Sequence, residues 1–264
     1  FPTRRSSDLA IDKAGHETGI HTWDHVAWQD AVRNQDASWT KAMMQKSWDR
    51  FVEIFGHAPV TYGAAGWQMN AVALQQLDTW GLKYASDGRA PLNLVPYRIV
   101  FPPAKVGEKP RRSQCVQYPT TLPTLDELLG LNNTTPENVH ERLLAATQEE
   151  REYGHVFTLH AELEGMKLLP AMERMLQGWL AQGYQLISME ELYSETANNI
   201  KFRNNTLTTA IKQELRVNIA DGYEYDGLVK VNSKVEDAFY HADGNWGMDF
   251  DKKYTKINNY FAFR

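Results

Sequence analysis

Short hydrophobic runs alternate with longer amphipathic stretches between residues 17 and 194. The short runs are rich in β-branched and aromatic residues and have turn-forming residues beside them, which is typical of buried strands. They predict strands at residues 17–22, 59–64, 82–86, 115–120, 155–161 and 184–188. Short strands separated by helical stretches favour βαβ units and a mostly parallel sheet.

The stretches between these strands carry signals for the start and end of helices. Ser38 is predicted to cap a helix that runs to Phe55, and Gly56 is predicted to end it. Further helices are predicted from Met69 to Trp80, from Thr135-Pro136 to near Gly154, and from Pro170 to before Gly183. The pattern therefore predicts an α/β fold whose six strands form an open sheet or part of a barrel.

Residues 88–114 interrupt this alternation. The segment contains Pro91, Pro96, Pro102, Pro103 and Pro110, together with the basic residues Lys105, Lys109, Arg111 and Arg112. A long proline-rich insertion in a compact domain is usually a lid or a binding loop. Its basic residues could meet a phosphate or an anionic headgroup, and a solvated surface loop is an equally good interpretation.

The two ends of the chain differ from this middle part. Residues 1–9 resemble the in-frame translation of a sequencing-adapter oligonucleotide, so we expect them to be an artefact that lies outside the fold. Beyond residue 197 the sequence is rich in Asn and polar residues and shows no further βα pattern. We therefore divide the chain into residues 1–9, a domain at 10–197 and an unassigned extension at 198–264.

Composition excludes several classes of protein. The 264 residues are long enough for a full hydrophobic core, and the formal net charge of −5 with a pI near 5.9 argues against a nucleic-acid partner. Cys115 is the only cysteine, which excludes a disulfide scaffold and a cysteine metal site. No apolar run approaches the roughly 18 residues of a membrane span.

The segment from Thr18 to His25 is the strongest chemical signal in the chain. It places His21 and His25 four residues apart, and imidazoles at this spacing share one face of a helical turn and could bind one divalent ion. Trp23 and Asp24 lie between them. His16 and Glu17 do not complete a helical H-E-x-x-H motif because the spacing to His21 is one residue too long.

Further clusters of polar and small residues follow the predicted strands. They are Tyr62–Gln68, Tyr84–Arg89, Pro119–Thr124 and Phe157–Gly165. In the last one His160 ends a hydrophobic strand and precedes Glu162 and Glu164, a plausible setting for an imidazole that transfers protons. A strand-end histidine is also often structural, so each cluster is weak by itself; together they predict one functional rim at the carboxyl ends of the strands.

The order of these motifs resembles a known family. H-T-W-D-H at residues 21–25, A-A-G-W at 64–67, Y-A-S-D at 84–87, T-L-P-T-L-D-E at 121–127 and T-L-H-A-E-L-E-G at 158–165 are similar to the motifs of polysaccharide deacetylases with a NodB homology domain. The resemblance covers roughly residues 10–197. It implies a distorted (β/α) barrel, incomplete at its N-terminus, and a divalent cofactor ion whose identity (Zn, Mn, Co or Mg) the resemblance leaves open.

The resemblance also implies roles for individual residues. His21 and His25 correspond to metal ligands and His160 to the general acid that protonates the departing amine. Trp23, Trp67, Asp87, Glu162 and Glu164 belong to the same motifs and are candidate substrate contacts. The activity implied is hydrolysis of the formamide of undecaprenyl-phosphate-linked 4-deoxy-4-formamido-L-arabinose, a step of lipid A modification that gives resistance to cationic peptides. The partners would be this lipid and, through it, the cytoplasmic face of the bacterial inner membrane.

Two departures from the family pattern bear on activity. The strand with the family's metal-binding and basic aspartates is expected upstream of residue 10, and Gln68 stands where the family has an arginine. We therefore expect this chain by itself to be inactive. A generic carbohydrate N-deacetylase and a non-catalytic fragment that binds a glycolipid are the alternatives.

Overall fold

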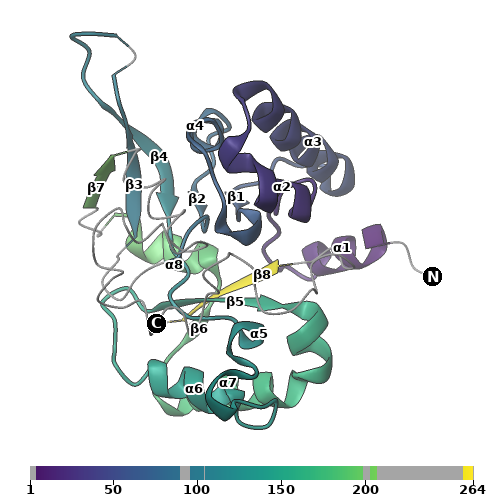
Figure 1. Ribbon diagram of the computed structural model, residues 1–264. Coiled ribbons are helices and arrows are strands. Elements are labelled where there is room, and N and C mark those ends of the chain that lie inside the picture. The colour runs from purple at the N-terminus through teal and green to yellow at the C-terminus, as the bar shows by residue number, and fades with distance from the viewer. Residues whose placement is uncertain (1–3, 90–95, 104, 199–202, 207–257, 264) are drawn as a thin grey trace. The chain divides into compact units, whose positions relative to one another are not determined.

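The computed structural model describes residues 4–89, 96–103, 105–198, 203–206 and 258–263, and the chain divides into two compact units (Figure 1). Unit 1 consists of Phe1–Gly88, Pro96–Tyr118 and Lys201–Leu215. Unit 2 consists of Arg89–Val95, Pro119–Ile200 and Arg216–Arg264. The predicted extension at 198–264 lies mostly outside the described residues, and the interpretation of residues 1–9 as an artefact stays a prediction.

Unit 1 contains a five-stranded sheet in the order β1-β2-β4-β3-β7. Its strands are β1 (Thr61–Tyr62), β2 (Tyr84–Ala85), β3 (Tyr97–Phe101), β4 (Arg111–Gln117) and β7 (Arg203–Thr206). β1, β2 and β4 are parallel, and β3 is antiparallel to β4. A single parallel bridge joins Ile20 to Tyr62, so the strand predicted at 17–22 is reduced to one paired residue.

The helices of unit 1 cover its buried strands. They are α1 (Arg4–Lys13), α2 (His25–Ala31), η1 (Val32–Asn34), α3 (Ala37–Phe55), η2 (Ala65–Trp67) and α4 (Ala71–Thr79). Gly56 ends α3 in the left-handed conformation, with φ 77°, as predicted. The cap at the other end is Asp36 rather than Ser38, since the Asp36 carboxylate accepts a hydrogen bond from the Trp39 amide at 2.8 Å.

Unit 2 has a three-stranded antiparallel sheet in the order β5-β8-β6. The strands are β5 (His155–His160), β6 (Leu186–Ile187) and β8 (Asn258–Phe263), and the helices are α5 (Leu125–Leu128), η3 (Leu131–Asn133), α6 (Val139–Ala146), the π-turn η4 (Leu163–Lys167), α7 (Leu169–Ala181) and α8 (Met189–Thr196). α6 ends well before Gly154, so the helix predicted from Thr135 is too long at both ends.

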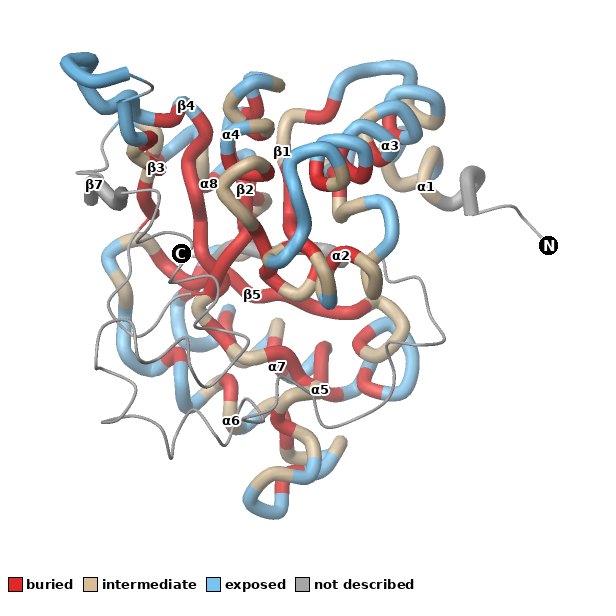
Figure 2. The backbone as a smooth tube through the Cα atoms, turned by 45° about the horizontal axis from the view of Figure 1, so that its top comes forward, coloured by how far each residue is buried: buried red, intermediate tan, exposed pale blue. Residues whose placement is uncertain are grey.

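The core of unit 2 lies between β5 and the helices α5, α6 and α7. Phe157 and Trp179 are almost fully buried there and their rings make an edge contact at 5.6 Å between centroids. Leu143 and Met175 pack in the same cluster with no exposed surface. Figure 2 shows buried residues concentrated along the strands and along one side of the helices, as amphipathic sequences require.

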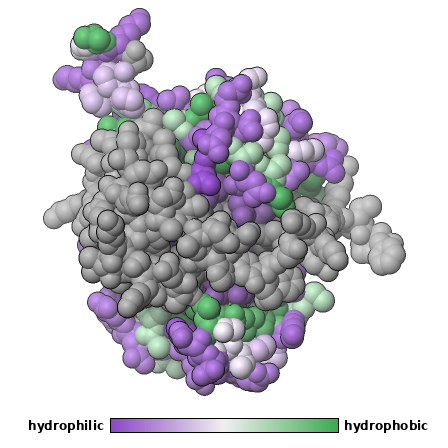
Figure 3. All heavy atoms as spheres, in the orientation of Figure 1, coloured by the Kyte–Doolittle hydropathy of each residue, from purple (hydrophilic) through white to green (hydrophobic). Residues whose placement is uncertain are grey.

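The proline-rich segment differs from its prediction as a lid or loop. The described part is a β-hairpin formed by β3 and β4, which extends away from the rest of unit 1 (Figure 1). In β3 buried positions alternate with partly exposed ones, as expected for a strand with one face toward the core. The prolines on both sides of this short run made the alternation hard to recognise in the sequence. The tip carries exposed Lys105, Lys109 and Val106, and Figure 3 shows hydrophilic and hydrophobic residues together there.

Among the described strands the sheet of unit 1 is mostly parallel, as predicted, with β3–β4 antiparallel, whereas the sheet of unit 2 is antiparallel and departs from the prediction. The fold class is nevertheless mixed α/β, and the sheets are open, which is consistent with an incomplete barrel. The strand ends at β1, β2 and β5 still carry the polar clusters recognised in the sequence.

Candidate functional site

The histidine pair of unit 1 lies where the chain leaves the sheet and enters α2. His21 directly follows the Ile20 bridge to Tyr62, Thr22 adopts a left-handed φ of 59°, and His25 is the first residue of α2. Asp24 caps this helix through a 3.0 Å hydrogen bond from the Ala27 amide. The two imidazoles lie side by side, with centroids 5.1 Å apart and planes inclined at 56°.

The closeness of the two rings therefore has a different cause from the predicted one. His21 precedes the helix, so the two histidines do not share a helical face. The positive φ of Thr22 turns the chain and brings the rings together instead. A non-glycine residue in this region costs of order 1 kcal/mol and is often found at functional sites.

His21 makes the hydrogen bond that is expected, in a metal-binding histidine, at the ring nitrogen that does not bind the metal. Its Nδ1 lies 2.7 Å from the carbonyl oxygen of Gly63. If the ring donates there, it is the tautomer protonated on Nδ1, with its lone pair on Nε2. Metal-ligating histidines usually donate their other ring N–H to a carbonyl or carboxylate in this way. The donor chemistry therefore fits a divalent ion, although the described residues contain no group of three or more His, Cys, Asp or Glu that could hold one.

Asp87 lies at the end of β2 and is completely buried. Its Oδ1 accepts a 2.9 Å hydrogen bond from the Ala64 amide, and its Oδ2 accepts one of 2.9 Å from Gln117 Nε2. Gln117 also accepts from the Asp87 amide at 3.3 Å. Burial raises the pKa of Asp87 to about 7 in spite of these hydrogen bonds. The substrate contact assigned to this residue stays a prediction.

The two tryptophan candidates of unit 1 differ in exposure. Trp23 is 47% exposed, whereas Trp67 is only 7% exposed in η2. The neighbouring Gly66 has φ 58°, and a Cβ there would lie 2.5 Å from the Gln29 side chain, so a larger residue would be strained and would displace Gln29. The carbonyl of buried Gln68 accepts a 2.7 Å hydrogen bond from Trp28 Nε1. Trp23 is thus accessible to a ligand, and the roles of both tryptophans stay predictions.

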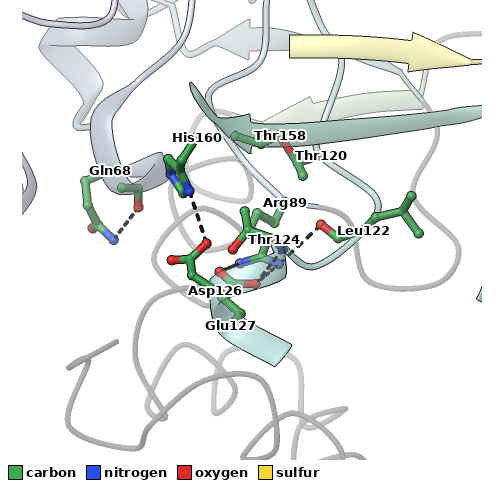
Figure 4. A network of polar contacts seen from close by, with 10 residues as sticks. Gln68, Arg89, Thr120, Leu122, Thr124, Asp126, Glu127, Thr158 and His160 are labelled. Atoms are coloured by element: carbon green, nitrogen blue, oxygen red, sulfur yellow. Dashed lines mark hydrogen bonds and ion pairs between the residues drawn. The ribbon is translucent and has the colours of Figure 1, made fainter. Parts of the chain in front are cut away.

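In unit 2, His160 at the end of β5 contacts the carboxylate of Asp126, which was not among the predicted site residues. His160 Nδ1 lies 3.1 Å from Asp126 Oδ1, at the start of α5 (Figure 4). The His160 side chain is 9% exposed and that of Asp126 is 23% exposed. A carboxylate at Nδ1 orients the imidazole and stabilises its protonated form, so Nε2 is the atom that can give or take a proton.

A second carboxylate holds the main chain of His160. Glu164 Oε2 accepts a 2.9 Å hydrogen bond from the His160 amide, and the Glu164 residue is 1% exposed in the π-turn η4. Burial raises the Glu164 pKa to about 7, and the charge and amide of His160 oppose that rise. π-Turns are rare and are frequent at functional sites. Glu162, just before this turn, is partly exposed, and the substrate roles of both glutamates stay predictions.

A buried ion pair supports the start of α5. Arg89 donates to both carboxylate oxygens of Glu127, at 2.5 and 2.8 Å, and both side chains are almost fully buried. Glu127 also accepts from the Thr124 amide at 3.1 Å in a capping box (Figure 4). Burial raises the pKa of Glu127, which Arg89 counteracts. The sequence offered one signal for this pair, the T-x-x-E capping motif at residues 124–127.

The structural comparison bears on the fold. The chain is similar to a solved structure described as a probable polysaccharide deacetylase from Pseudomonas aeruginosa PAO1, with a TM-score of 0.50 and 19% identity over 75% of this chain and 65% of that one. This likeness concerns the fold. It agrees with the family predicted from the motifs at the ends of β1, β2 and β5.

Sequence relatives are more particular. The chain is 28% identical over 181 residues to a protein of Shewanella sediminis named as a probable 4-deoxy-4-formamido-L-arabinose-phosphoundecaprenol deformylase ArnD, and 27% identical over 194 residues to one of the same name from Wigglesworthia glossinidia brevipalpis. These matches cover 69% and 70% of this chain but 54% and 61% of the relatives. No family model matches the chain. The resemblance to polysaccharide deacetylases, and among them to these deformylases, is confirmed.

Proposed function

We propose that the protein is an amide hydrolase that removes the formyl group from 4-deoxy-4-formamido-L-arabinose carried on undecaprenyl phosphate. The observation that supports this most is the similarity to two proteins named for that reaction, over 181 and 194 residues. The reaction converts a neutral formamide into formate and an amine. It would serve lipid A modification and thereby resistance to cationic peptides.

His21 and His25 would hold a divalent ion as two of its ligands. The adjacency of their rings and the Gly63 contact of His21 support this role. When bound, such an ion supplies Lewis acidity toward the amide carbonyl and its attacking water. The protein's own contribution is to fix the ring of His21 from the side opposite Nε2.

His160 would hold a proton at Nε2 and deliver it to the departing amine nitrogen. An amine leaves an amide poorly unless it is protonated, so a positioned imidazole contributes typically 10²–10⁴-fold to the rate. Asp126 would keep the His160 ring oriented and favour its protonated form, as the 3.1 Å contact at Nδ1 suggests. Trp23 and Glu162, which are exposed and partly exposed, are proposed to contact the sugar, whereas buried Glu164 would hold the main chain of His160.

The lipid substrate would bring the protein to the cytoplasmic face of the inner membrane. Among the described residues, no helix has the length and apolar character needed to cross a bilayer. We propose peripheral attachment through the undecaprenyl phosphate, and no nucleic-acid partner.

The test compares formate release from the formamido-sugar lipid by the 264-residue chain and by a longer chain with an upstream Asp-bearing strand. In the longer chain His160→Ala should lower kcat by about 10²–10⁴-fold with metal content unchanged. His21→Ala should lower metal content as well. His140→Ala, on α6, is the control and should change neither.

Three outcomes would contradict parts of this proposal. Acetate release from an N-acetyl analogue in preference to formate would make the protein a carbohydrate deacetylase. Loss of metal in His160→Ala would make His160 a ligand. Substantial turnover by the 264-residue chain would contradict the proposed need for the upstream strand and would direct the search for the base to Asp24 or Asp87.

A further inference from the structure

The peptide group between Gly63 and Ala64 connects His21 to Asp87 through two hydrogen bonds. The carbonyl oxygen of Gly63 is 2.7 Å from His21 Nδ1, and the amide of Ala64 donates to Asp87 Oδ1 at 2.9 Å. Gly63 C=O and Ala64 N–H are the two ends of the same planar amide group. The imidazole and the buried carboxyl group are therefore joined through a single polarisable unit.

We propose that Asp87 is a positioning residue for His21, acting through the Gly63–Ala64 peptide bond to strengthen the His21 Nε2 lone pair toward a divalent cation. This inference rests on the proposed function only in that His21 is a ligand. It assigns to Asp87 a role in the interior of unit 1, in place of the direct substrate contact predicted from sequence.

The physical basis is cooperative hydrogen bonding. A carboxylate that accepts from an amide N–H polarises the amide group and increases the negative charge on its carbonyl oxygen. A hydrogen bond to that oxygen is then stronger by roughly 10–30%. The carbonyl then accepts more strongly from His21 Nδ1–H. Since a stronger hydrogen bond at one ring nitrogen raises the basicity of the other, Nε2 becomes the better donor to a metal.

The surroundings of Asp87 favour this role over contact with a ligand. The residue has no exposed surface, and each carboxylate oxygen already accepts a hydrogen bond from the protein. The Gln117 side chain accepts from the Asp87 N–H and donates to Asp87 Oδ2. These two hydrogen bonds orient the carboxylate so that Oδ1 faces the Ala64 amide. The Gly63 N–H, which belongs to the preceding peptide group, donates to the Ile20 carbonyl at 2.9 Å and holds Gly63 beside the segment that leads into His21.

The experiment measures the His21 ring directly, in the full chain without metal. NMR of ¹⁵N-histidine-labelled protein at about pH 8, above the Asp87 pKa of about 7, reports the Nδ1–H proton shift and both ring ¹⁵N shifts. In Asp87→Asn the Nδ1–H signal should move upfield and the Nε2 signal should change in the direction of a weaker donor. Ser86→Ala, a neighbouring buried site outside this link, is the control and should leave both signals in place.

A double variant guards against a general effect of removing charge. Asp87→Asn with Gln117→Glu keeps a buried carboxylate beside an amide but moves the charge away from the Ala64 N–H. Its His21 signals should match those of Asp87→Asn. Signals like those of the parent would show that nearby charge alone matters and would overturn the proposal, as would unchanged signals in Asp87→Asn.

Titration with Zn²⁺ then separates this inference from the proposed function. Asp87→Asn should bind Zn²⁺ about 3–10-fold more weakly than the parent, less than the 10–100-fold typical of losing a direct hydrogen-bond partner. If the parent fails to bind Zn²⁺ while the NMR shifts behave as expected, the metal role of His21 is wrong and the link to Asp87 stands. If the parent binds Zn²⁺ and Asp87→Asn binds it equally well, the positioning role is wrong.

Discussion

Replacing Glu164 with glutamine should make the stability of the protein less sensitive to pH. The Glu164 carboxyl is 1% exposed, and its pKa is raised from 4.5 to about 7, chiefly because burial disfavours the charged form. The folded state therefore holds this proton more tightly than the unfolded state does. The resulting stabilisation is complete below about pH 4.5 and is lost as the pH rises through about 7.

The size of the effect follows from that difference in pKa. A change from 4.5 to about 7 corresponds to about 3 kcal/mol in total, of which roughly 2.5 kcal/mol falls between pH 5 and pH 8. Glutamine is neutral throughout and can still accept the hydrogen bond from the His160 amide. The difference in unfolding free energy between parent and variant should therefore change by about that amount over this range.

Urea denaturation of both chains at several pH values is the assay. Glu173→Gln, which removes an exposed carboxylate from α7, is the matched control and should run parallel to the parent. Parallel curves for the parent and Glu164→Gln would refute the reasoning, because they would mean that the carboxyl pays no desolvation cost in the folded state.

Three further predictions concern stability and are measured by the same assay. Asp36→Ala should cost about 1 kcal/mol by removing the cap of α3, whereas Ser38→Ala should be neutral, and the reverse order would restore Ser38 as the cap. Glu127→Gln should cost about 3–5 kcal/mol because it leaves the Arg89 charge buried without its partner; a cost below about 1 kcal/mol would show that the pair is hydrated. Phe157→Ala should cost about 3–5 kcal/mol through the cavity left beside Trp179, and a small loss would mean that the core of unit 2 collapses around it.

Much of the local structure could be predicted because its signals are local. The helix α3 ends at Gly56, and α7 has Pro170 at its start, as the sequence indicates. The hairpin could not be recognised because prolines surround β3, and its pairing with β4 depends on residues that are distant in sequence. α6 was predicted too long because its N-terminal signal at Thr135 forms turns before Val139.

In the candidate site too, features with local sequence signals could be predicted and features that depend on tertiary packing could not. The motifs placed His21 and His160 at strand ends. The structure has His160 at the end of β5 and His21 directly after the bridged residue Ile20, and His25 begins α2. Asp126 and Glu127 belong to the T-L-P-T-L-D-E motif at residues 121–127, but the motif does not indicate a partner for either residue. Only the fold brings His160, 34 residues further along, onto Asp126, and Arg89 onto Glu127. Such partners are chosen by tertiary packing, which no periodicity in the sequence records.

The left-handed turn at Thr22 has a consequence for protein design. H-x₃-H is commonly engineered as a metal clip by placing both histidines on an existing helix, where the rigid helical rise sets their separation. In this protein the separation is set by a strained turn between a bridged residue and a helix cap. A transplanted copy would have to carry Ile20 to Asp24 with their backbone conformation, since the two histidines grafted onto a regular helix would present a different pair of lone-pair directions.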